Sequence, residues 1–521
     1  MNAVKTIFVV LVVYVFEYTE TARILGVFPT PSISHQIVFR PLMHELAKRG
    51  HNVVVITPDP AFPRGQAPEN LTEIDVHDVS YANVENLVSS YRGRKEYFYL
   101  QFKTFLEEIS KIMEVQLQVP AVAKILRQEK NKFDLIFIEA CSRTAPGFSH
   151  ALSAPMIQIS SLGVSPAHYF LVGAPIQPFL YPTVIQQRVH NLTLSEKIYA
   201  VFLLVRMTFL IFLTEKKDHD LAKKYFGEDL PGFEDLLLNN NQMLFINEHP
   251  LWAGNRPVSS NVLYIGGLHQ TVDKPLPEDL RAYLDAAKNG VIYISFGTNV
   301  MPSMLDPKKI EIMVNVLSQT SFDVLWKWDG DLPGQSENIR TSKWLPQSDL
   351  LKHPNIKLFI TQGGLQSTDE AINAAVPLLG IPLIADQWYN VEKYVYHKIG
   401  EYIDFESMDE DILRNTIEAI TTNQKYKDNI LNLRAVMRQY PKKPLELAVW
   451  WTEHIIKYGG DHLRPPSAGK WFLEYYEIEL VLSVLSLLII LIFVLCSIIF
   501  LLFFYIKRYV KVKLQNKNKE E

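Results

Sequence analysis

Two glycines lie between an apolar run and a helical pattern in residues 358–375. Leu358-Phe359-Ile360 predicts a buried strand, and Gln366 to Ala375 predicts a helix. The turn between them, Thr361-Gln362-Gly363-Gly364, holds no Lys or Arg. The first turn of a helix nevertheless leaves about four N–H groups unpaired and carries a partial positive charge. Such a turn can bind a phosphate, although an ordinary strand–helix connection has the same residues.

Side chains suited to the other parts of a sugar nucleotide lie near this turn in the sequence. Trp344 can stack on a flat base, and Gln347 can hydrogen-bond to it. Glu370, on the predicted helix, can accept hydrogen bonds from ribose hydroxyls. Asp386 and Gln387 follow another apolar run and can hold vicinal hydroxyls of a sugar. The segment thus offers candidate contacts to a base, a ribose, a diphosphate and a sugar.

One histidine, His35, follows the first predicted strand within the stretch FPTPSISHQ. An alcohol is a poor nucleophile until a base removes its proton, and an imidazole can do this near neutral pH. His44 lies within a helical pattern and His51 begins a strand, so both are interpreted as structural or surface groups. On its position alone His35 can be such a base, and an ordinary structural histidine is the alternative.

Alternating strands and helices predict an open parallel α/β sheet in each half of the chain. In the first half, strands are expected at 23–28, 51–58, 133–139 and 156–160. In the second half, strands are expected at 291–296, 323–326, 356–361 and 377–385. A stretch rich in Pro, Asn and Gly, 247–262, predicts the linker. Ligands of such sheets bind beyond the carboxyl ends of the strands.

The composition indicates a globular protein. The chain has 521 residues, of which 48% are hydrophobic and 21% charged, and its formal net charge is -4. Its basic residues are dispersed, which argues against a nucleic-acid partner. Cys141 lies in a globular stretch and Cys496 in a long apolar run, so no disulfide framework is expected. The apolar stretch Tyr199–Leu213 is interrupted by Arg206 and is interpreted as a buried or interfacial helix, with membrane contact as the alternative.

Both ends of the chain carry membrane signals. Lys5, the apolar run Ile7–Phe16 and the small residues that follow predict a signal peptide over residues 1–22, a retained anchor being the alternative. Residues 480–506 contain no charged side chain and are long enough to span a bilayer. The basic tail 507–521 predicts a cytosolic C-terminus and hence a type I membrane protein with its main part in a lumen.

Short local signals fit that topology. Asn70 and Asn191 begin N-glycosylation sequons, which are used only in the lumen. Lys517 and Lys519 stand fifth and third from the C-terminus and resemble the dilysine retrieval signal of endoplasmic reticulum membrane proteins. A merely basic, solvated tail is the alternative. We therefore expect the endoplasmic reticulum membrane as the location.

The C-terminal half resembles the signature of the UDP-glycosyltransferases that conjugate small lipophilic molecules, over WLPQSDLLKHPNIKLFITQGGLQSTDEAINAAVPLLGIPLIADQWYN, residues 344–390. The similarity continues through NVLYIGGLH and VIYISFGTNV upstream, and through KPLELAVWW to the anchor and basic tail downstream. The N-terminal half resembles the family in its first motif and strand order, and insect members are the similar relatives. The resemblance implies the GT-B fold, two facing Rossmann-like domains with a C-terminal transmembrane helix.

This resemblance implies an order of segments and a role for each. The N-terminal domain is expected to bind the acceptor and the C-terminal domain the UDP-sugar. A helix near Leu445–Lys457 is expected to return to the first domain. The expected segments are 1–22 signal peptide, 23–246 acceptor domain, 247–262 linker, 263–440 UDP-sugar domain, 441–479 return helix and juxtamembrane segment, 480–506 transmembrane helix, and 507–521 tail.

The resemblance also implies roles for single residues. Trp344 and Gln347 match residues at the uracil, Glu370 matches the ribose-binding glutamate, and Asp386 with Gln387 matches the pair that holds the donor sugar. Other positions match a catalytic histidine, the acid that orients it and the surroundings of the diphosphate: His35, Glu139, Ser295, Thr298, Arg256 and Ser367.

Two positions depart from the family pattern. Gln362 stands where many relatives have a histidine before the two glycines, so a hydrogen-bond donor remains but a charge is lost. Glu139 stands where the family has an aspartate, and its side chain is one methylene longer. Both changes bear on the donor affinity and the position of the base.

No metal and no cofactor is expected. Asp329-Gly330-Asp331 and Asp218-His219-Asp220 have the Asp-x-Asp spacing of metal-dependent glycosyltransferases, but both lie in charged, turn-like sequence and are interpreted as solvated surface. The stretch HELAKRGH has Lys48 in place of the second zinc-binding histidine. A Gly-x-Gly-x-x-Gly motif after a strand is absent from the sequence, which argues against a nicotinamide enzyme.

The sequence therefore predicts an inverting transfer of a sugar from a UDP-sugar to a hydroxyl of a small lipophilic acceptor, as in detoxification. Glucose is the expected sugar because the insect relatives use it, and glucuronate stays open. A membrane-anchored binding protein that keeps the donor fold without turnover is the rival hypothesis. A homo-oligomer is compatible with the sequence.

Overall fold

The computed structural model describes residues 21–82, 93–270, 273–300, 305–439 and 442–520. Most of the predicted signal peptide, including Lys5 and Ile7–Phe16, lies outside the described residues. The chain divides into two units, residues 1–468 and residues 469–521.

A parallel seven-stranded sheet forms the first part of the larger unit. Its strand order is β3-β2-β1-β4-β5-β6-β7. The strands are β1 Arg23–Val27, β2 Asn52–Thr57, β3 Leu71–Asp75, β4 Leu135–Glu139, β5 Met156–Ser160, β6 Asn241–Ile246 and β7 Val262–Tyr264. The central strands β1, β4 and β5 are buried almost throughout. They read as continuous apolar runs because a parallel sheet is covered on both faces.

The first sheet extends further along the chain than the predicted linker allows. Residues 247–262 were expected to connect the two sheets, but β7 begins at Val262 and pairs in parallel with β6. Val262 and Tyr264 pack in an apolar cluster with Leu244 and Ile246 of β6. Burial of these side chains therefore holds β7 in the first sheet, and the connection between the sheets follows Tyr264.

Helices cover both faces of the first sheet. They are α2 Ile33–Lys48, α3 His77–Tyr81, η1 Lys95–Tyr97, α5 Phe98–Leu117, α6 Pro120–Gln128, α7 Gly147–Leu152, α8 Pro166–Leu171, α9 Leu194–Phe226 and α10 Phe233–Asn240. One apolar cluster joins α2 to β1 and β2 and also includes Ala448, Val449 and Ile455 of α18, Pro444–Tyr458. The side chain of Arg49 also donates to Glu453 of α18 at 3.2 Å. The stretch predicted as a return helix thus packs on the first sheet.

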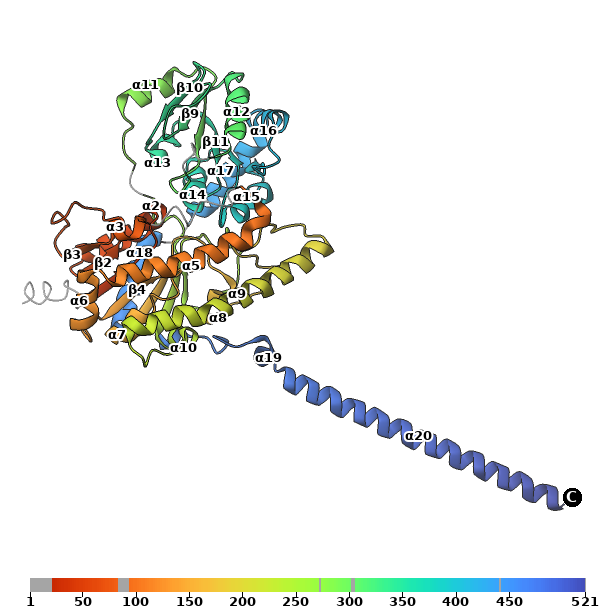
Figure 1. Cartoon of the computed structure of the whole chain (residues 1–521). Coiled ribbons are helices and arrows are strands. Elements are labelled where there is room, and N and C mark those ends of the chain that lie inside the picture. Colours follow the sequence, from red (N-terminus) through yellow and green to blue (C-terminus); the bar gives the residue numbers. More distant parts are fainter. Residues whose placement is uncertain (1–20, 83–92, 271–272, 301–304, 440–441, 521) are drawn as a thin grey trace, which may run out of the picture. The chain divides into compact units, whose positions relative to one another are not determined.

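Helix α9 is longer than the apolar stretch that suggested it. Its inner face carries buried Leu203, Met207 and Leu210, which pack with α5. Figure 1 shows α5 and α9 running side by side. Its outer face exposes Ile198 and Phe209, among other large apolar side chains. The helix is therefore half exposed, which excludes the fully buried alternative.

A parallel six-stranded sheet forms the second part of the larger unit, in the order β10-β9-β8-β11-β12-β13. Its strands are β8 Val291–Ser295, β9 Asp323–Lys327, β10 Ile339–Ser342, β11 Ile356–Thr361, β12 Leu378–Gly380 and β13 Gly400–Tyr402. Its helices are α11 Glu278–Ala286, α12 Pro307–Ser318, α13 Gln347–Leu350, α14 Leu365–Ala374, α15 Gln387–Tyr396, α16 Glu410–Thr422 and α17 Gln424–Arg438. The expected strand 377–385 ends at Gly380, and the rest of it forms the loop that leads to α15.

The second unit is dominated by one helix. The short 3-10 helix η3, Asp461–Leu463, still belongs to the first unit, and α19, Phe472–Tyr475, begins the second. Helix α20, Ile478–Glu520, then continues without interruption (Figure 1). It and α9 are the described helices long and apolar enough to cross a membrane. Helix α20 includes the predicted span 480–506 and continues through the basic tail. The side chains of Lys517 and Lys519 lie outside the described residues.

Candidate functional site

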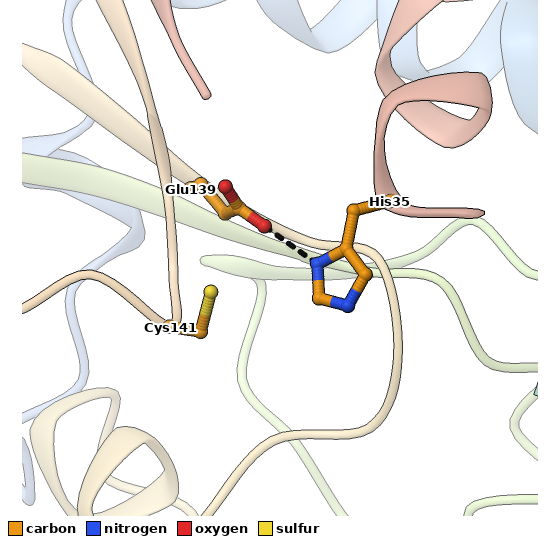
Figure 2. A group of neighbouring side chains, drawn as sticks. All are labelled: His35, Glu139 and Cys141. Atoms are coloured by element: carbon orange, nitrogen blue, oxygen red, sulfur yellow. Dashed lines mark hydrogen bonds and ion pairs between the residues drawn. The ribbon is translucent and has the colours of Figure 1, made fainter. Parts of the chain in front are cut away.

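His35 and Glu139 meet at the carboxyl ends of two neighbouring strands. His35 lies in the first turn of α2, which follows β1, and Glu139 is the last residue of β4. The two strands pair in parallel, with Val27 beside Ile138. His35 Nδ1 lies 2.7 Å from Glu139 Oε1, and Figure 2 marks this contact with a dashed line. The parallel register therefore brings together two residues that are 104 positions apart.

The carboxylate of Glu139 is held from two sides. It is almost completely buried, and the backbone N–H of Thr30 donates to Oε2 at 3.1 Å. A carboxylate accepts hydrogen bonds, so its histidine partner donates through Nδ1–H. The lone pair of His35 then lies on Nε2, at the ring edge turned away from Glu139 (Figure 2). This arrangement can accept a proton at Nε2 and stabilise the imidazolium that results.

Cys141, two residues after β4, belongs to the same group. Its Sγ lies 3.2 Å from Thr30 Oγ1. Burial, and then the neighbouring charge of Glu139, raise the pKa of the Cys141 thiol well above its usual value. Sequence analysis did not single out this residue for the site, because nothing in the local pattern distinguishes a cysteine after a strand from a packing residue.

The predicted phosphate turn has the expected shape. Gly363 has a φ of 89°, and a Cβ there would run into Val391, so glycine is required. Gly364 is the N-cap of α14, and a Cβ there would have only the side chain of Gln362 within 4 Å. The backbone at the helix start is therefore not covered by a neighbouring side chain at this point. Gln362 is buried, and its Oε1 has no hydrogen-bond partner among the described residues.

Three of the predicted donor-binding residues form one hydrogen-bonded group. Gln347 Nε2 donates to Ser367 Oγ at 2.9 Å and to Glu370 Oε2 at 2.7 Å. Its Oε1 accepts from Tyr293 Oη at 3.0 Å. Burial raises the pKa of Glu370 to about 7, and the hydrogen bond from Gln347 opposes this shift. Gln347 therefore positions Ser367 and Glu370, a role that the sequence pattern did not indicate.

Trp344 remains open to solvent. Its side chain is 67% exposed, which is unusual for a tryptophan in a folded domain. The ammonium group of Lys327 lies 5.0 Å from the centroid of the indole ring. A large exposed aromatic face is what stacking on a flat base requires.

Asp386 is fixed by a residue that sequence analysis missed. Asn390, one helical turn further along α15, donates through Nδ2 to Asp386 Oδ2 at 2.8 Å and to the carbonyl of Gly363 at 2.9 Å. Its Oδ1 accepts from Trp252 Nε1 at 3.3 Å. Asn390 therefore connects the predicted sugar-binding acid to the phosphate turn. The spacing of four residues on a helix was a signal that could have identified it.

The neighbouring Gln387 differs from the expectation. Its Oε1 accepts hydrogen bonds from the backbone N–H groups of Leu383 at 2.8 Å and Ile384 at 2.9 Å. These bonds shape the loop before α15, in which Ala385 has a positive φ of 53°. Only the NH₂ end of the amide then remains for a sugar hydroxyl.

A loop of the first sheet contacts a loop of the second sheet, and this contact lies close to both His35 and the predicted donor-binding residues. Ser32 Oγ, just before α2, donates to Asn299 Oδ1 in the loop after β8 at 2.9 Å. Burial raises the pKa of Asp386; the hydrogen bond from Asn390 opposes this shift most, and an electrostatic interaction with His35 opposes it less. Ser295 is buried at the end of β8, where its Oγ accepts from the N–H of Gly297, and Thr298 is exposed in the loop that follows.

Arg256 does not meet the expectation that it lies at the diphosphate. Its guanidinium is buried and donates to the carbonyls of Pro175, Tyr181 and Pro182. It also lies over the ring of Tyr169, 3.8 Å from its centroid. The guanidinium thus holds the 175–182 loop through three of its backbone carbonyls.

The two Asp-x-Asp stretches differ from each other. Asp329 and Asp331 are exposed, as expected of solvated surface. Asp218 is buried and forms an ion pair with Arg143, so its interpretation as solvated surface was wrong. The physical reason is that Asp218 lies on the inner face of α9, so that its side chain is directed toward the protein interior.

Both predicted glycosylation positions are exposed. Asn70 and Asn191 lie outside helices and strands and have positive φ values of 64° and 51°. Asparagine tolerates this conformation better than most residues. Each side chain is therefore accessible for a glycan, and the modification stays a prediction.

The fold and this site define a GT-B glycosyltransferase. Two solved structures share the fold: a glycosyltransferase of kitacinnamycin, with a TM-score of 0.56 and 18% identity, and the glycosyltransferase VinC in complex with DTDP, with a TM-score of 0.56 and 15% identity. Each comparison covers 84% of this chain, and 99% and 100% of the respective structures.

The family is shown by the sequence as well. Residues 23–516 match the family model described as UDP-glucoronosyl and UDP-glucosyl transferase, and the chain belongs to this family. An ecdysteroid UDP-glucosyltransferase of Spodoptera littoralis nuclear polyhedrosis virus is 34% identical over 502 residues, 92% of this chain and 97% of the relative. UDP-glucosyltransferase 2 of Dactylopius coccus is 28% identical, with 92% of each chain covered. UDP-glucuronosyltransferase 2B18 of Macaca fascicularis is 27% identical, covering 86% and 87%. The chain is therefore a UDP-glycosyltransferase, which transfers a sugar from a UDP-sugar to an acceptor.

Proposed function

We propose that this enzyme transfers glucose from UDP-glucose to a hydroxyl of a small lipophilic acceptor, with inversion at the anomeric carbon. The contact of 2.7 Å between His35 Nδ1 and Glu139 Oε1 carries the proposal, because it directs the basic nitrogen Nε2 away from the acid. The names of two relatives favour glucose, since the viral and the scale-insect proteins are both called glucosyltransferases. The mammalian relative is called a glucuronosyltransferase, so the sugar requires a direct test.

The proposed reaction is a single displacement. The acceptor oxygen attacks the anomeric carbon while His35 Nε2 accepts the hydroxyl proton. The bond from the anomeric carbon to the β-phosphate oxygen breaks, and UDP leaves with the electron pair. The negative charge of Glu139 stabilises the imidazolium. The start of α14, at Gly364, stabilises the growing charge on the diphosphate.

The donor is proposed to lie along the C-terminal sheet. Its uracil stacks on Trp344, its ribose hydroxyls bind Glu370, and its sugar hydroxyls bind Asp386 and the free end of Gln387. Residues around Gly364, together with Ser295, Thr298, Gln362 and Ser367, surround the diphosphate. No metal is needed in this proposal, because the helix start and hydroxyl groups supply the positive electrostatic potential that the phosphates require.

A lipophilic acceptor fits an enzyme held at a membrane. The apolar helix α20 supplies a candidate span, and the exposed aromatic residues Trp471, Phe472 and Tyr476 precede it, as interfacial side chains often do. We propose that the enzyme is a type I protein of the endoplasmic reticulum membrane with its catalytic part in the lumen. A protease-protection assay on sealed microsomes tests this orientation: the catalytic part should resist digestion and the tail should not.

The decisive experiment measures product formation with several UDP-sugars and a panel of hydroxylated acceptors, including phenols and an ecdysteroid, in membranes that contain the full chain. UDP release should depend on an acceptor, should be largest with UDP-glucose, and should be lost in His35→Ala. NMR of the product should show the inverted anomer. Donor binding without turnover on any acceptor would instead support the rival hypothesis of a binding protein.

A further inference from the structure

The base of the proposed reaction lies within a group of three different metal-binding side chains. One ring nitrogen of His35, one carboxylate oxygen of Glu139 and the Sγ of Cys141 all lie within 4.8 Å of one another. Figure 2 shows the sulfur of Cys141 pointing into the space beside the ring and the carboxylate. Three separate segments supply these groups: the first turn of α2, the end of β4, and the loop after β4.

This set of donors matches the coordination chemistry of zinc. Zinc binds a thiolate, an imidazole nitrogen and a carboxylate oxygen at about 2.0–2.3 Å, so the ligand atoms of a tetrahedral site lie roughly 3.5 Å apart. Side-chain movements on the order of 1 Å bring the three ligand atoms from their present separation to the separation that a tetrahedral zinc site needs. Three protein ligands leave the fourth position to water, as in catalytic zinc sites.

The surroundings allow a metal ion to enter and do not require it for folding. The side chain of His35 is 12% exposed and Cys141 is half-buried, so the group is reached from outside. Without a metal, Glu139 is satisfied by His35 and Thr30, and Cys141 lies at hydrogen-bond distance from Thr30 Oγ1. The site is thus complete in the metal-free enzyme, and a bound ion would replace existing hydrogen bonds.

We propose that a zinc ion binds His35, Glu139 and Cys141 reversibly and thereby switches off the transferase. On binding, the thiol of Cys141 releases its proton to solvent and the thiolate coordinates the metal. The carboxylate of Glu139 gives up its hydrogen bond to His35 and coordinates the metal instead. Binding through either ring nitrogen removes the basic function of His35. If zinc binds Nδ1, the ring proton moves to Nε2. If zinc binds Nε2, the metal occupies the Nε2 lone pair. In both cases the group can no longer accept the proton of the acceptor.

The binding part of this inference stands on the three side chains alone, whereas the inhibition rests on the proposed role of His35 as base. Two readouts separate them. Cobalt(II) replaces zinc as the spectroscopic probe, because a cobalt–thiolate bond gives a charge-transfer absorption band in the near ultraviolet. The full chain in detergent micelles is titrated with cobalt chloride, and then zinc chloride is added to displace it.

The matched control uses the second cysteine. Cys496 lies in α20, outside this group, so Cys496→Ser should keep the band and the affinity. Cys141→Ser should abolish the band and weaken zinc binding by at least about ten-fold, because even loss of a residue that only supports a metal ligand costs about that much. Cys141→Ala should give the same result, which excludes an effect of the new hydroxyl. A band that persists in Cys141→Ser, or that disappears in Cys496→Ser, would overturn the proposal.

Turnover is measured in parallel as the ratio of rates with and without zinc for each variant. Wild type and Cys496→Ser should be inhibited by zinc in the same concentration range as cobalt is displaced, and chelator should restore activity. Cys141→Ser should be at least about ten-fold less sensitive. A one-to-one cobalt complex at Cys141 without any inhibition would reject the switch. A chain without measurable turnover under all conditions would instead challenge the proposed function, while the cobalt readout would still test the site.

Discussion

The proposed catalytic pair and the proposed donor-binding residues are organised in different ways. His35 and Glu139 are in direct contact, and the pairing of β1 with β4 fixes them. The donor-binding residues bond instead to one another: Gln347 to Glu370, and Asn390 to Asp386. A nucleotide that enters must replace some of these bonds, so donor affinity is a difference between two sets of hydrogen bonds. The comparison predicts large effects on turnover from the first region and moderate effects on binding from the second.

The largest effect is expected for His35→Ala. Removal of a general base lowers kcat by about 10²- to 10⁴-fold, whereas the dissociation constant of UDP-glucose should change less than about two-fold because the donor lies along the other sheet. Single-turnover rates and calorimetric titration measure the two quantities. His44→Ala, in the same helix but outside the site, serves as control and should keep its turnover. Equal loss of donor binding and turnover in His35→Ala would show that the two regions are not separate.

Glu139→Gln should come second. The amide keeps the size of the side chain but removes the charge that stabilises an imidazolium, so kcat should fall by about 100-fold, in line with a lost orienting acid. Glu139→Asp shortens the side chain by one methylene and lengthens the contact with His35, so about a ten-fold loss is expected. The rate as a function of pH checks the assignment, since only the Gln variant changes the charge next to the base. Full activity of Glu139→Gln would refute the pairing as a catalytic device.

Asn390→Ala should raise the KM for UDP-glucose by about ten-fold with a smaller effect on kcat, because it frees the side chain of Asp386 and the carbonyl of Gly363. Loss of three buried hydrogen-bond partners also destabilises the fold, by about 1–3 kcal/mol. Steady-state kinetics and thermal unfolding in the absence of ligand measure the two effects. Asn429→Ala, an exposed hydrogen-bonded asparagine on α17, is the matched control. If unfolding changes but KM does not, Asn390 acts on the fold alone.

Glu370 should give the donor affinity a pH dependence. Burial raises its pKa to about 7, and only the carboxylate form accepts hydrogen bonds from both ribose hydroxyls. UDP-glucose should therefore bind more tightly as the pH rises through 7, by up to about ten-fold. The stability of the folded state has the opposite sign: the contribution of this group is complete in acid and is lost as the pH rises through 7. Glu370→Gln should make the affinity independent of pH, as titration calorimetry at several pH values will show.

The smallest effect is expected at Gln362. A histidine there restores the residue of many relatives and can carry a positive charge toward the diphosphate, so Gln362→His should tighten donor binding by a few-fold, or about 0.5–1 kcal/mol. Fluorescence titration with UDP-glucose measures it, with Gln319→His at the exposed C-cap of α12, outside the proposed site, as control. Weaker binding in Gln362→His would mean that the space beside Gly297 is shaped for an amide.

Much of the fold and of the donor site could be predicted because the relevant residues are close in sequence. Strands β8, β9 and β11 and the helix start at Gly364 follow from local periodicity and glycine placement. Residues 344–390 then carry most of the proposed donor-binding residues on consecutive strand ends and helix starts. The family resemblance also indicated His35 and Glu139, although no local pattern joins two residues 104 positions apart.

The differences from the sequence-based expectations share one cause. The position of β7, the ion pair of Asp218 and the loop contacts of Arg256 all depend on which side chains are buried against distant segments. Charge and composition do not contain that information. The positive charge of Arg256 suggested a phosphate ligand, yet its guanidinium donates to carbonyls of the 175–182 loop.

The sequence by itself determined the class of fold, the candidate membrane span and the chemical groups available at each strand end, because periodicity and residue type act locally. Only the tertiary structure decided which of those groups meet. It placed Glu139 in contact with His35 and Cys141 close to both, and it placed Asn390 where it donates a hydrogen bond to Asp386. Hydrogen bonds act over about 3 Å, and chain folding alone brings distant residues within that range.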